Sequence, residues 1–242
     1  MKAVCGSDIG CIREENQDRV AIEYFDNAIL GVLCDGMGGA NCGSEASTLA
    51  INEFISTFKT GYREYFNSNT ICDLLVKSME NANYTVYATS LSDDSKYGMG
   101  TTCVATLLLN DGRVYIVNVG DSRAYLITDN DIKQITVDHN YSQYLYSIGK
   151  ITAKELSSHP DRNALIRAVG VEDTIRVDSF ELMPIESFKV LICSDGLHGM
   201  ISDDNIKTIV NGNALEEVPK RLIEKAKACG GRDNVSVAIL QP

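Results

Sequence analysis

Aspartates that follow apolar runs are the residues of this sequence best suited to chemistry. Val32 to Gly39 reads VLCDGMGG, so an apolar run breaks at Asp35 into glycines. A carboxylate at the end of a buried strand is costly to desolvate unless a cation pairs with it. The glycines would let backbone carbonyls approach an ion closely. For this motif alone, the alternative is a tight turn in which Asp35 caps the following helix.

The same pattern recurs at distant points of the chain. KVLICSDGLHG spans residues 189–199, YIVNVGDSR spans 115–123 and GGRDNVSVAIL spans 230–240, while DIGCIREENQD at 8–18 precedes another apolar run. Such scattered carboxylates can meet only if their strands lie side by side in sheets. Carboxylate oxygens are the ligands that hard divalent ions prefer. The pattern therefore predicts one oxygen-ligand site for divalent ions, built from Asp18, Asp35, Asp121, Asp195 and Asp233.

Hydrophobic periodicity predicts the elements that would position these aspartates. We expect strands at 3–7, 20–25, 28–34, 103–109, 113–119, 124–128, 132–135, 176–182 and 189–193, and a last strand after Asp233. Amphipathic patterns predict one helix through Ala46 and Phe58, one starting near Thr70 with a capping-box-like Asp73, one after Ser202 and one over 215–228. Two stacked sheets with a helical layer outside each would bury both pairs of helices.

Residues 139–169, named here the flap segment, show no clear period. Short helical pieces are expected at 141–148 and 153–156. An irregular stretch of this size between strands that carry metal-type aspartates is typical of a lid beside a site. We therefore expect one domain over residues 1–242, with a flap at about 139–169.

Composition excludes several classes of protein. Lys and Arg total 22 against 33 Asp and Glu, so the formal charge is 22 − 33 = −11, and no basic stripe favours nucleic-acid binding. No apolar run has the length of a membrane span, and the first residues lack a signal-peptide core. The eight cysteines show no C-x-x-C spacing. We expect reduced thiols in a cytoplasmic protein with neither a nucleic-acid nor a membrane partner.

Six motifs in order carry a resemblance over nearly the whole chain. They are R-x-x-N-x-D at 13–18, DGMGG at 35–39, GMGTT at 98–102, GDSR at 120–123, SDG at 194–196 and DN at 233–234. In this order and spacing they resemble the bacterial branch of the metal-dependent protein phosphatases (PPM), the type 2C serine/threonine phosphatases. The resemblance implies an α+β fold, a four-layer α-β-β-α sandwich with two central antiparallel sheets.

The resemblance also implies a role for each matching residue. Asp35 would bridge two Mn²⁺ or Mg²⁺ ions, and the Gly36 carbonyl would be a further ligand to one of them. Asp195 and Asp233 would hold the other ion, and Asp18 would bind waters of the metal site. Ligation by oxygen without histidine favours Mg²⁺ or Mn²⁺ over Zn²⁺.

The implied reaction is hydrolysis of phosphoserine and phosphothreonine in proteins. A water that bridges the two ions would attack phosphorus in line. Arg13 would clamp the phosphate, because its planar guanidinium matches two phosphate oxygens. For each of these residues, the alternative is an ordinary surface salt bridge or a helix cap.

Two positions depart from the pattern of the family. Many bacterial members carry histidine directly after GMGG, where this chain has Ala40, and aspartate four residues after the SDG aspartate, where this chain has Gly199 beside His198. Asp121 and Asp195 would keep a third, weaker ion. Without a histidine acid, a water at the metal site would have to protonate the leaving alkoxide, so turnover would be lower.

The sequence lacks the motifs of several other classes of enzyme. No cysteine has the C-x₅-R spacing of cysteine phosphatases, no P-loop or G-x-G-x-x-G is present, and His139, His159 and His198 lack zinc-hydrolase spacing. The remaining alternative is a catalytically weak, phosphatase-like module that binds phosphoproteins for regulation. The expected partners are phosphorylated proteins, including a serine/threonine kinase.

Overall fold

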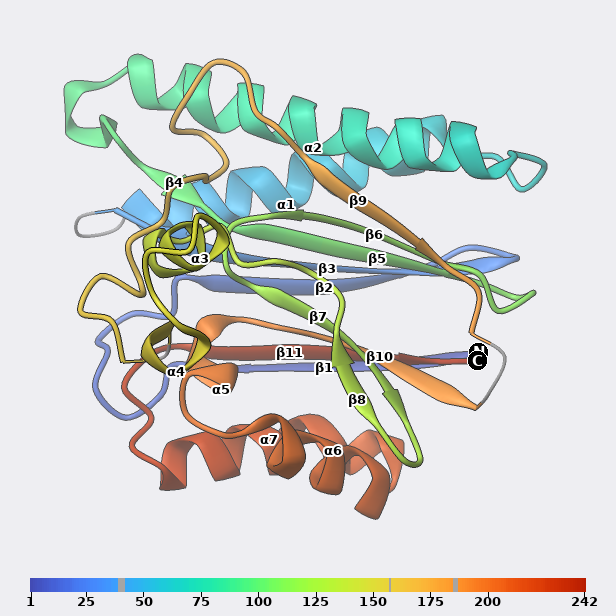
Figure 1. Cartoon of the computed structure of the whole chain (residues 1–242). Coiled ribbons are helices and arrows are strands. Elements are labelled where there is room, and N and C mark those ends of the chain that lie inside the picture. Colours follow the sequence, from blue (N-terminus) through green and yellow to red (C-terminus); the bar gives the residue numbers. More distant parts are fainter. Residues whose placement is uncertain (39–41, 157, 185–186) are drawn as a thin grey trace.

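The computed structural model describes residues 1–38, 42–156, 158–184 and 187–242. Two antiparallel sheets lie face to face, and helices cover the outer face of each (Figure 1). This is the four-layer α+β sandwich that the sequence predicted, so the predicted fold class is confirmed. The strand order brings together residues that are far apart in the chain.

The first sheet has the strand order β1, β11, β10, β7, β8 and contains both ends of the chain. Its strands are β1 (Lys2–Asp8), β11 (Val235–Gln241), β10 (Phe188–Cys193), β7 (Arg123–Thr128) and β8 (Ile132–Gln134). Its outer face is covered by α5 (Asp195–His198), α6 (Asp203–Gly212), the 3₁₀ turn η2 (Leu215–Glu217) and α7 (Val218–Ala228). Ser202 caps α6, which begins directly after it as the sequence predicted. Pro219 lies in the first turn of α7, where a missing backbone N–H is tolerated.

The second sheet has the strand order β2, β3, β5, β6, β9, and a short strand β4 pairs with β3. The strands are β2 (Asp18–Tyr24), β3 (Ala28–Met37), β4 (Gly100–Thr101), β5 (Cys103–Leu109), β6 (Val114–Val119) and β9 (Asp178–Leu182). Two long helices cover its outer face, α1 (Cys42–Gly61) and α2 (Ser68–Leu91), and a 3₁₀ turn η1 (Asp94–Lys96) follows them.

Three apolar clusters hold the layers together. One lies between the sheets and includes Ile29, Leu33 and Ile192, which are almost completely buried. The other two lie between each sheet and its helices, around Phe54 and around Leu222. Burial of a large apolar side chain contributes about 1.5–3 kcal/mol, so these layers fix the relative positions of the strand ends.

Several predicted boundaries differ from the structure by one to three residues; the last helix, for example, begins at Val218 after the 3₁₀ turn η2 and not at 215. Two of the differences have a clear cause. The third strand does not end at Cys34 but continues to Met37, because Asp35 pairs with Asp18 of β2 and Gly36 pairs with Thr101 of β4. The expected start of a helix near Thr70 is also displaced. The N-cap of α2 is Asn67, whose side chain accepts the backbone N–H of Thr70, so Thr70 lies inside the first turn.

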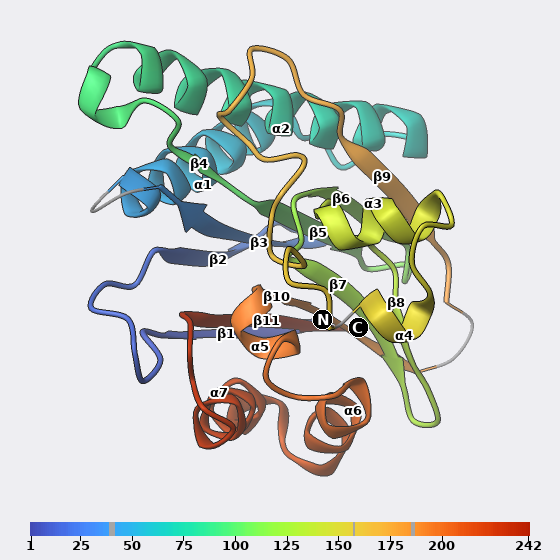
Figure 2. The same cartoon turned by 60° about the vertical axis from the view of Figure 1, so that its left-hand side comes forward.

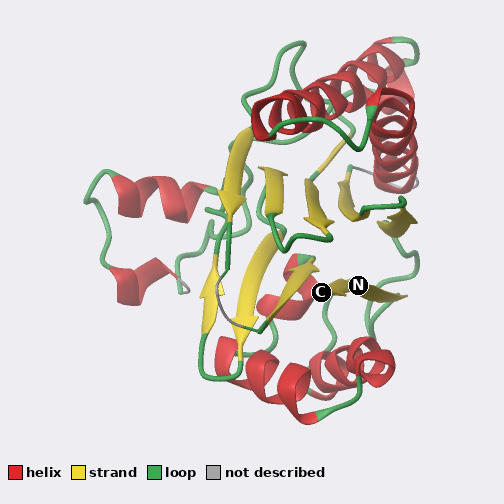
Figure 3. Ribbon diagram, turned by 90° about the vertical axis from the view of Figure 1, so that its right-hand side faces the viewer, coloured by secondary structure: helices red, strands yellow, loops and turns green. Residues whose placement is uncertain are grey.

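The flap segment contains two short helices, α3 (Tyr141–Ser147) and α4 (Ala153–Leu156), close to the predicted positions. Figure 3 shows this pair standing off one side of the two sheets, while Figure 2 shows them on the side of β7 and β8. An isolated bridge between Thr101 and Val169 joins the end of the segment to β4. None of the helices in the described ranges combines the length and continuous apolar character that a membrane crossing requires.

Candidate active site

Six of the seven residues singled out from the sequence line one pocket of about 300 Å³. The six are Arg13, Asp35, Gly36, Asp121, Asp195 and Asp233. They come from the ends of strands in both sheets and from the loop before β2, as the strand order requires. The seventh, Asp18, is 2% exposed and lies beside Asp35 on the neighbouring strand.

Asp18 and Asp35 are direct partners in the antiparallel pair of β2 and β3. Like charges directly opposite on neighbouring strands are destabilising. The Ser194 hydroxyl donates to Asp18 Oδ2 at 2.7 Å, but within the described residues Asp18 Oδ1 has no hydrogen-bond partner. A buried carboxylate oxygen that is left unpaired is a position where a cation or a water is expected.

Asp195 is the first residue of α5, a short helix that the sequence analysis did not predict. Directly after it, Gly196 lies against the backbone before β11, and a Cβ there would be 1.9 Å from the Asn234 carbonyl oxygen. Only glycine permits this approach, which brings Asp195 beside Asp233. The Oδ1 atom of Asp195 is also buried without a partner among the described residues.

Gly36 is needed for a comparable reason. A Cβ at Gly36 would lie 2.0 Å from the carbonyl oxygen of Gly43 at the start of α1 and 2.8 Å from that of Gln17. The sequence predicted that Gly36 lets its carbonyl approach an ion closely. The structure gives this glycine a packing role as well. It lets the first turn of α1 pack against the strand that carries Asp35.

Arg13 forms an ion pair with Asp233 at 2.7 Å, and its side chain is 54% exposed. A second hydrogen bond to Asp233 comes from the backbone N–H of Asn234. Hydrogen bonding to Asp233 raises the pKa of Arg13. The exposed guanidinium is therefore at the pocket mouth, where it can exchange a carboxylate partner for a phosphate.

The carboxylates perturb one another strongly. Burial raises the pKa of Asp195 to about 8, with the charges of Asp121 and Asp233 adding to the shift. Burial also raises the pKa of Asp35 well above its usual range, and the charges of Asp18 and Asp195 contribute further. A set of carboxylates that disfavours its own ionisation is stabilised by divalent cations.

The donor set fits hard divalent ions. Its side-chain donors are carboxylates, Gly36 lines the same pocket, and oxygen ligands suit Mg²⁺ and Mn²⁺. Among the described residues, no three His, Cys, Asp or Glu side chains enclose a single ion position. An ion here would therefore complete its coordination with backbone carbonyls and water.

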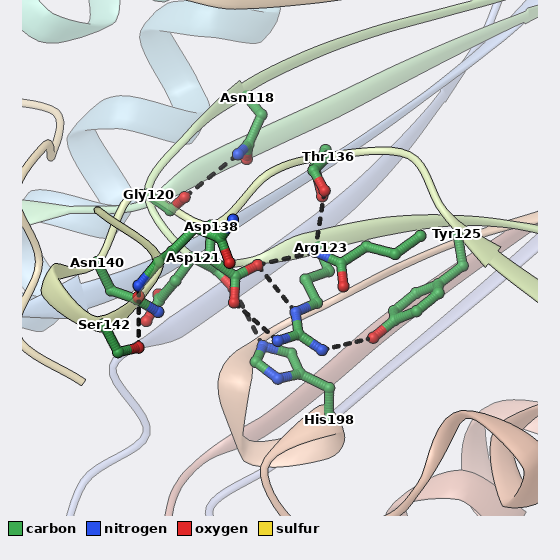
Figure 4. A network of polar contacts seen from close by, with 12 residues as sticks. Asn118, Gly120, Asp121, Arg123, Tyr125, Thr136, Asp138, Asn140, Ser142 and His198 are labelled. Atoms are coloured by element: carbon green, nitrogen blue, oxygen red, sulfur yellow. Dashed lines mark hydrogen bonds and ion pairs between the residues drawn. The ribbon is translucent and has the colours of Figure 1, made fainter. Parts of the chain in front are cut away.

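Asp121 lies in a buried polar network, in which His198 contacts its backbone (Figure 4). His198 donates from Nε2 to the Asp121 carbonyl oxygen at 3.0 Å, and burial lowers the pKa of His198 to about 3, so the ring is neutral. Arg123 binds Asp138 through two hydrogen bonds of 2.9 and 2.7 Å. Burial raises the pKa of Asp121 to about 7, and the charge of Asp138 adds to it.

The two departures from the family pattern have different outcomes. Ala40 lies outside the described residues. Gly199 is exposed at the end of α5, next to His198, and contributes no side-chain oxygen near Asp121. The side chain beside Asp121 is therefore the imidazole of His198, which contacts the backbone carbonyl of Asp121.

Sequence reasoning missed two residues that position this site. Ser194 belongs to the SDG motif, but its contact with Asp18 joins residues 176 positions apart. His139 accepts the Gly120 N–H at Nδ1 and donates its own backbone N–H to the Gly120 carbonyl, which fixes the residue before Asp121. Nothing in the local sequence pattern indicates either contact.

Comparison with known sequences gives a consistent result. The protein phosphatase 2C family model matches residues 13–233. The chain is 34% identical over 243 residues to the serine/threonine phosphatase stp of Listeria monocytogenes serotype 4b, covering 100% of this chain and 96% of that protein. It is 34% identical over 239 residues to the serine/threonine protein phosphatase PstP of Mycobacterium tuberculosis, covering 96% of this chain and 43% of PstP.

Solved structures agree with the sequence matches. The crystal structure of serine/threonine phosphatase Stp1 from Staphylococcus aureus is similar with a TM-score of 0.92 and 32% identity, covering 100% of this chain and 94% of that chain. The PPM Ser-Thr phosphatase MsPP from Mycobacterium smegmatis, in complex with cacodylate, is similar with a TM-score of 0.85 and 30% identity. The two chains are covered to 100% and 98%.

Proposed function

The chain belongs to the protein phosphatase 2C family and is a serine/threonine phosphatase of the bacterial PPM type, and we propose that it works with two divalent metal ions. The observation that carries this proposal is the shared pocket of Asp35, Asp195 and Asp233, with Asp18 paired to Asp35. When bound, Mn²⁺ or Mg²⁺ ions would supply an activated water for in-line attack on phosphorus.

Each residue of the pocket would have its own role in binding the two metal ions. Asp35 would hold both ions and Gly36 would add its carbonyl to one of them. Asp195 and Asp233 would hold the second ion, and Asp18, fixed by Ser194, would orient water from behind. This assignment follows the resemblance of the motifs to the family, and the pocket that Asp35, Asp195 and Asp233 share supports it.

Arg13 would bind the phosphate of the substrate. Its partner in this structure, Asp233, is one of the proposed ligands, so metal binding at Asp233 would free the guanidinium. A planar fork beside the metal site can then hold two phosphate oxygens and orient phosphorus for attack.

We also propose a third, weaker metal position at Asp121 and Asp195. Gly199 supplies no carboxylate there, and His198 is engaged with the Asp121 carbonyl. Calorimetric titration with Mn²⁺ should resolve two tighter sites and one weaker site. Three sites of equal affinity would contradict this assignment.

The test of the function is hydrolysis of p-nitrophenyl phosphate and a phosphothreonine peptide with Mn²⁺, with Mg²⁺ and with EDTA. We expect metal-dependent turnover that EDTA abolishes and that falls at least about 100-fold in Asp233→Ala, because a metal ligand is lost. The matched control is Asp129→Ala, which removes an exposed carboxylate in the turn between β7 and β8.

Turnover that survives EDTA, or that Asp233→Ala leaves intact, would exclude the two-metal mechanism. No observation in the described residues favours a binding module over the enzyme. Phosphorylated proteins are the substrates of this class, and a serine/threonine kinase among them is part of the proposal. The cytoplasmic location, the single domain and the flap role of residues 139–169 stay predictions.

A further inference from the structure

A second pocket of about 480 Å³ adjoins the proposed metal site. The two pockets share Asp121, Asp195, Asp233 and Asn163 as walls, so they are continuous. One side of the second pocket is the flap segment, and the opposite side is α5 with the loop that follows it. A peptide whose phosphate lies at the metal site would therefore place a neighbouring side chain in the second pocket.

Two arginines from distant parts of the chain line this second pocket. Arg162 comes from the flap segment and Arg232 directly precedes Asp233. Both are exposed, and within the described residues neither guanidinium has an ion pair or a side-chain hydrogen bond. The other arginine of the pocket, Arg123, is already neutralised by Asp138.

The charges that remain in the second pocket are of two kinds. Asp121, Asp195 and Asp233 belong to the proposed metal site, where cations would balance them. Arg162 and Arg232 have no such balance, and Gly199 offers no carboxylate to them. The part of the second pocket formed by Arg162 and Arg232 is therefore locally positive, although the chain as a whole carries a charge of −11.

We propose that Arg162 and Arg232 form a subsite for a second anionic group of the substrate, a carboxylate or a phosphate one or two residues from the phosphoserine or phosphothreonine. The subsite rests on the proposed function, because it extends the same peptide-binding site. Guanidinium groups bind carboxylates and phosphates through paired hydrogen bonds. The distant negative charges are screened over about 8 Å at physiological salt, so contact with the arginines decides the preference.

The test compares phosphothreonine peptides that differ at one neighbouring residue, on the N-terminal or the C-terminal side. That residue is Gln, Glu or a non-hydrolysable phosphonate, which separates a carboxylate from a phosphate source. We expect kcat/KM to be about three- to tenfold higher with the anionic residue than with Gln on one of the two sides. The preference should fall as ionic strength rises.

Arg162→Gln and Arg232→Gln should each reduce this ratio, and the double variant should bring it to about one. The matched control is Arg221→Gln, which removes the same charge from an exposed ion pair on α7 and should keep the wild-type ratio. The ratio is measured within each variant, so a general change in turnover does not affect it.

Binding of the same peptides with a phosphonate in place of phosphothreonine tests the subsite independently of catalysis. The ratio of dissociation constants should follow the same order. An active enzyme without the preference, or with a preference for Lys or Arg neighbours, would overturn the subsite and leave the phosphatase assignment intact. An inactive protein that still binds anionic peptides more tightly would support the subsite and overturn the proposed mechanism.

Discussion

At the scale of single residues, the site is defined by carboxylates that would repel one another without a cation. Asp18 and Asp35 face each other across two strands, and burial raises the pKa of Asp18 to about 6. The hydroxyl of Ser194 opposes this shift by donating to Asp18. The neutral hydroxyl of Ser194 therefore stabilises the ionised form of Asp18 through a hydrogen bond.

This arrangement predicts the effect of Ser194→Ala. The variant removes the donor to Asp18 Oδ2 and the acceptor of the Ser236 N–H, which are 2.7 and 3.0 Å from Ser194 Oγ. We expect a loss of about 1–3 kcal/mol in the free energy of unfolding and a lower affinity for Mn²⁺. Urea unfolding and calorimetric titration measure the two effects.

The control for Ser194→Ala is Ser92→Ala, an exposed serine after α2 whose removal should change stability by less than about 0.5 kcal/mol. Equal Mn²⁺ affinity in Ser194→Ala and wild type would show that Ser194 does not position Asp18.

At the scale of elements, the short helix α5 decides where Asp195 lies. Its first turn packs backbone to backbone against the segment before β11, at Gly196 and Asn234. The second sheet uses a similar contact, where Gly36 lies against the first turn of α1. Two close contacts between elements thus set the positions of the central carboxylates.

Gly196→Ala tests this role of α5. The added Cβ would lie 1.9 Å from the Asn234 carbonyl oxygen, so α5 or β11 must move and Asp195 must shift relative to Asp233. We expect a destabilisation of about 1–3 kcal/mol and at least a tenfold loss of Mn²⁺ affinity. Denaturant unfolding and metal titration measure both.

Gly212→Ala is the control, because a Cβ there meets nothing within 4 Å. It should leave Mn²⁺ affinity unchanged and stability within about 1 kcal/mol of wild type. A Gly196→Ala protein that binds Mn²⁺ like wild type would show that the close contact is not needed for the site.

At the scale of the whole molecule, the proposed metal binding would be linked to folding, because the proposed ligands come from both sheets. An ion at 100 times its dissociation constant would stabilise the fold by about 2.7 kcal/mol. For a chain of 242 residues this corresponds to a rise in Tm of roughly 5–10 °C. Thermal unfolding with Mn²⁺ and with EDTA measures the shift.

Asp233→Ala should lose most of this rise and Asp129→Ala should keep it. An unchanged Tm in saturating Mn²⁺ would contradict a metal site shared between the sheets.

The second prediction for the whole molecule concerns pH. Burial lowers the pKa of His139, which hydrogen bonds to Asp178 and Gly120 and lies beside Arg167. The folded state therefore binds a proton at this residue less readily than the unfolded state. Its contribution to stability is intact above the unfolded pKa of about 6.5 and is lost as pH falls below it.

His139→Gln removes this titration. Between pH 7.5 and 5, wild type should therefore lose more of its free energy of unfolding than the variant, by up to about 1.4 kcal/mol per pH unit. Urea unfolding across this range measures the difference. Parallel stability curves for the two proteins would show that His139 does not contribute.

The sequence by itself determined the layers and the set of acidic residues. Hydrophobic periodicity depends on neighbouring residues, so it located most strands, the main helices and the aspartates at their ends. The order of six motifs was enough to indicate the family. These features are local or linear, and a single chain displays them directly.

Only the tertiary structure decided how the aspartates face one another. The continuation of β3 through Asp35 depends on pairing with β2 and β4, and the contact between Ser194 and Asp18 spans 176 positions. Glycine is required at position 196 because the Asn234 carbonyl, which belongs to another part of the chain, occupies the space of a Cβ. Contacts of this kind depend on packing between layers, which the periodicity of the sequence does not encode.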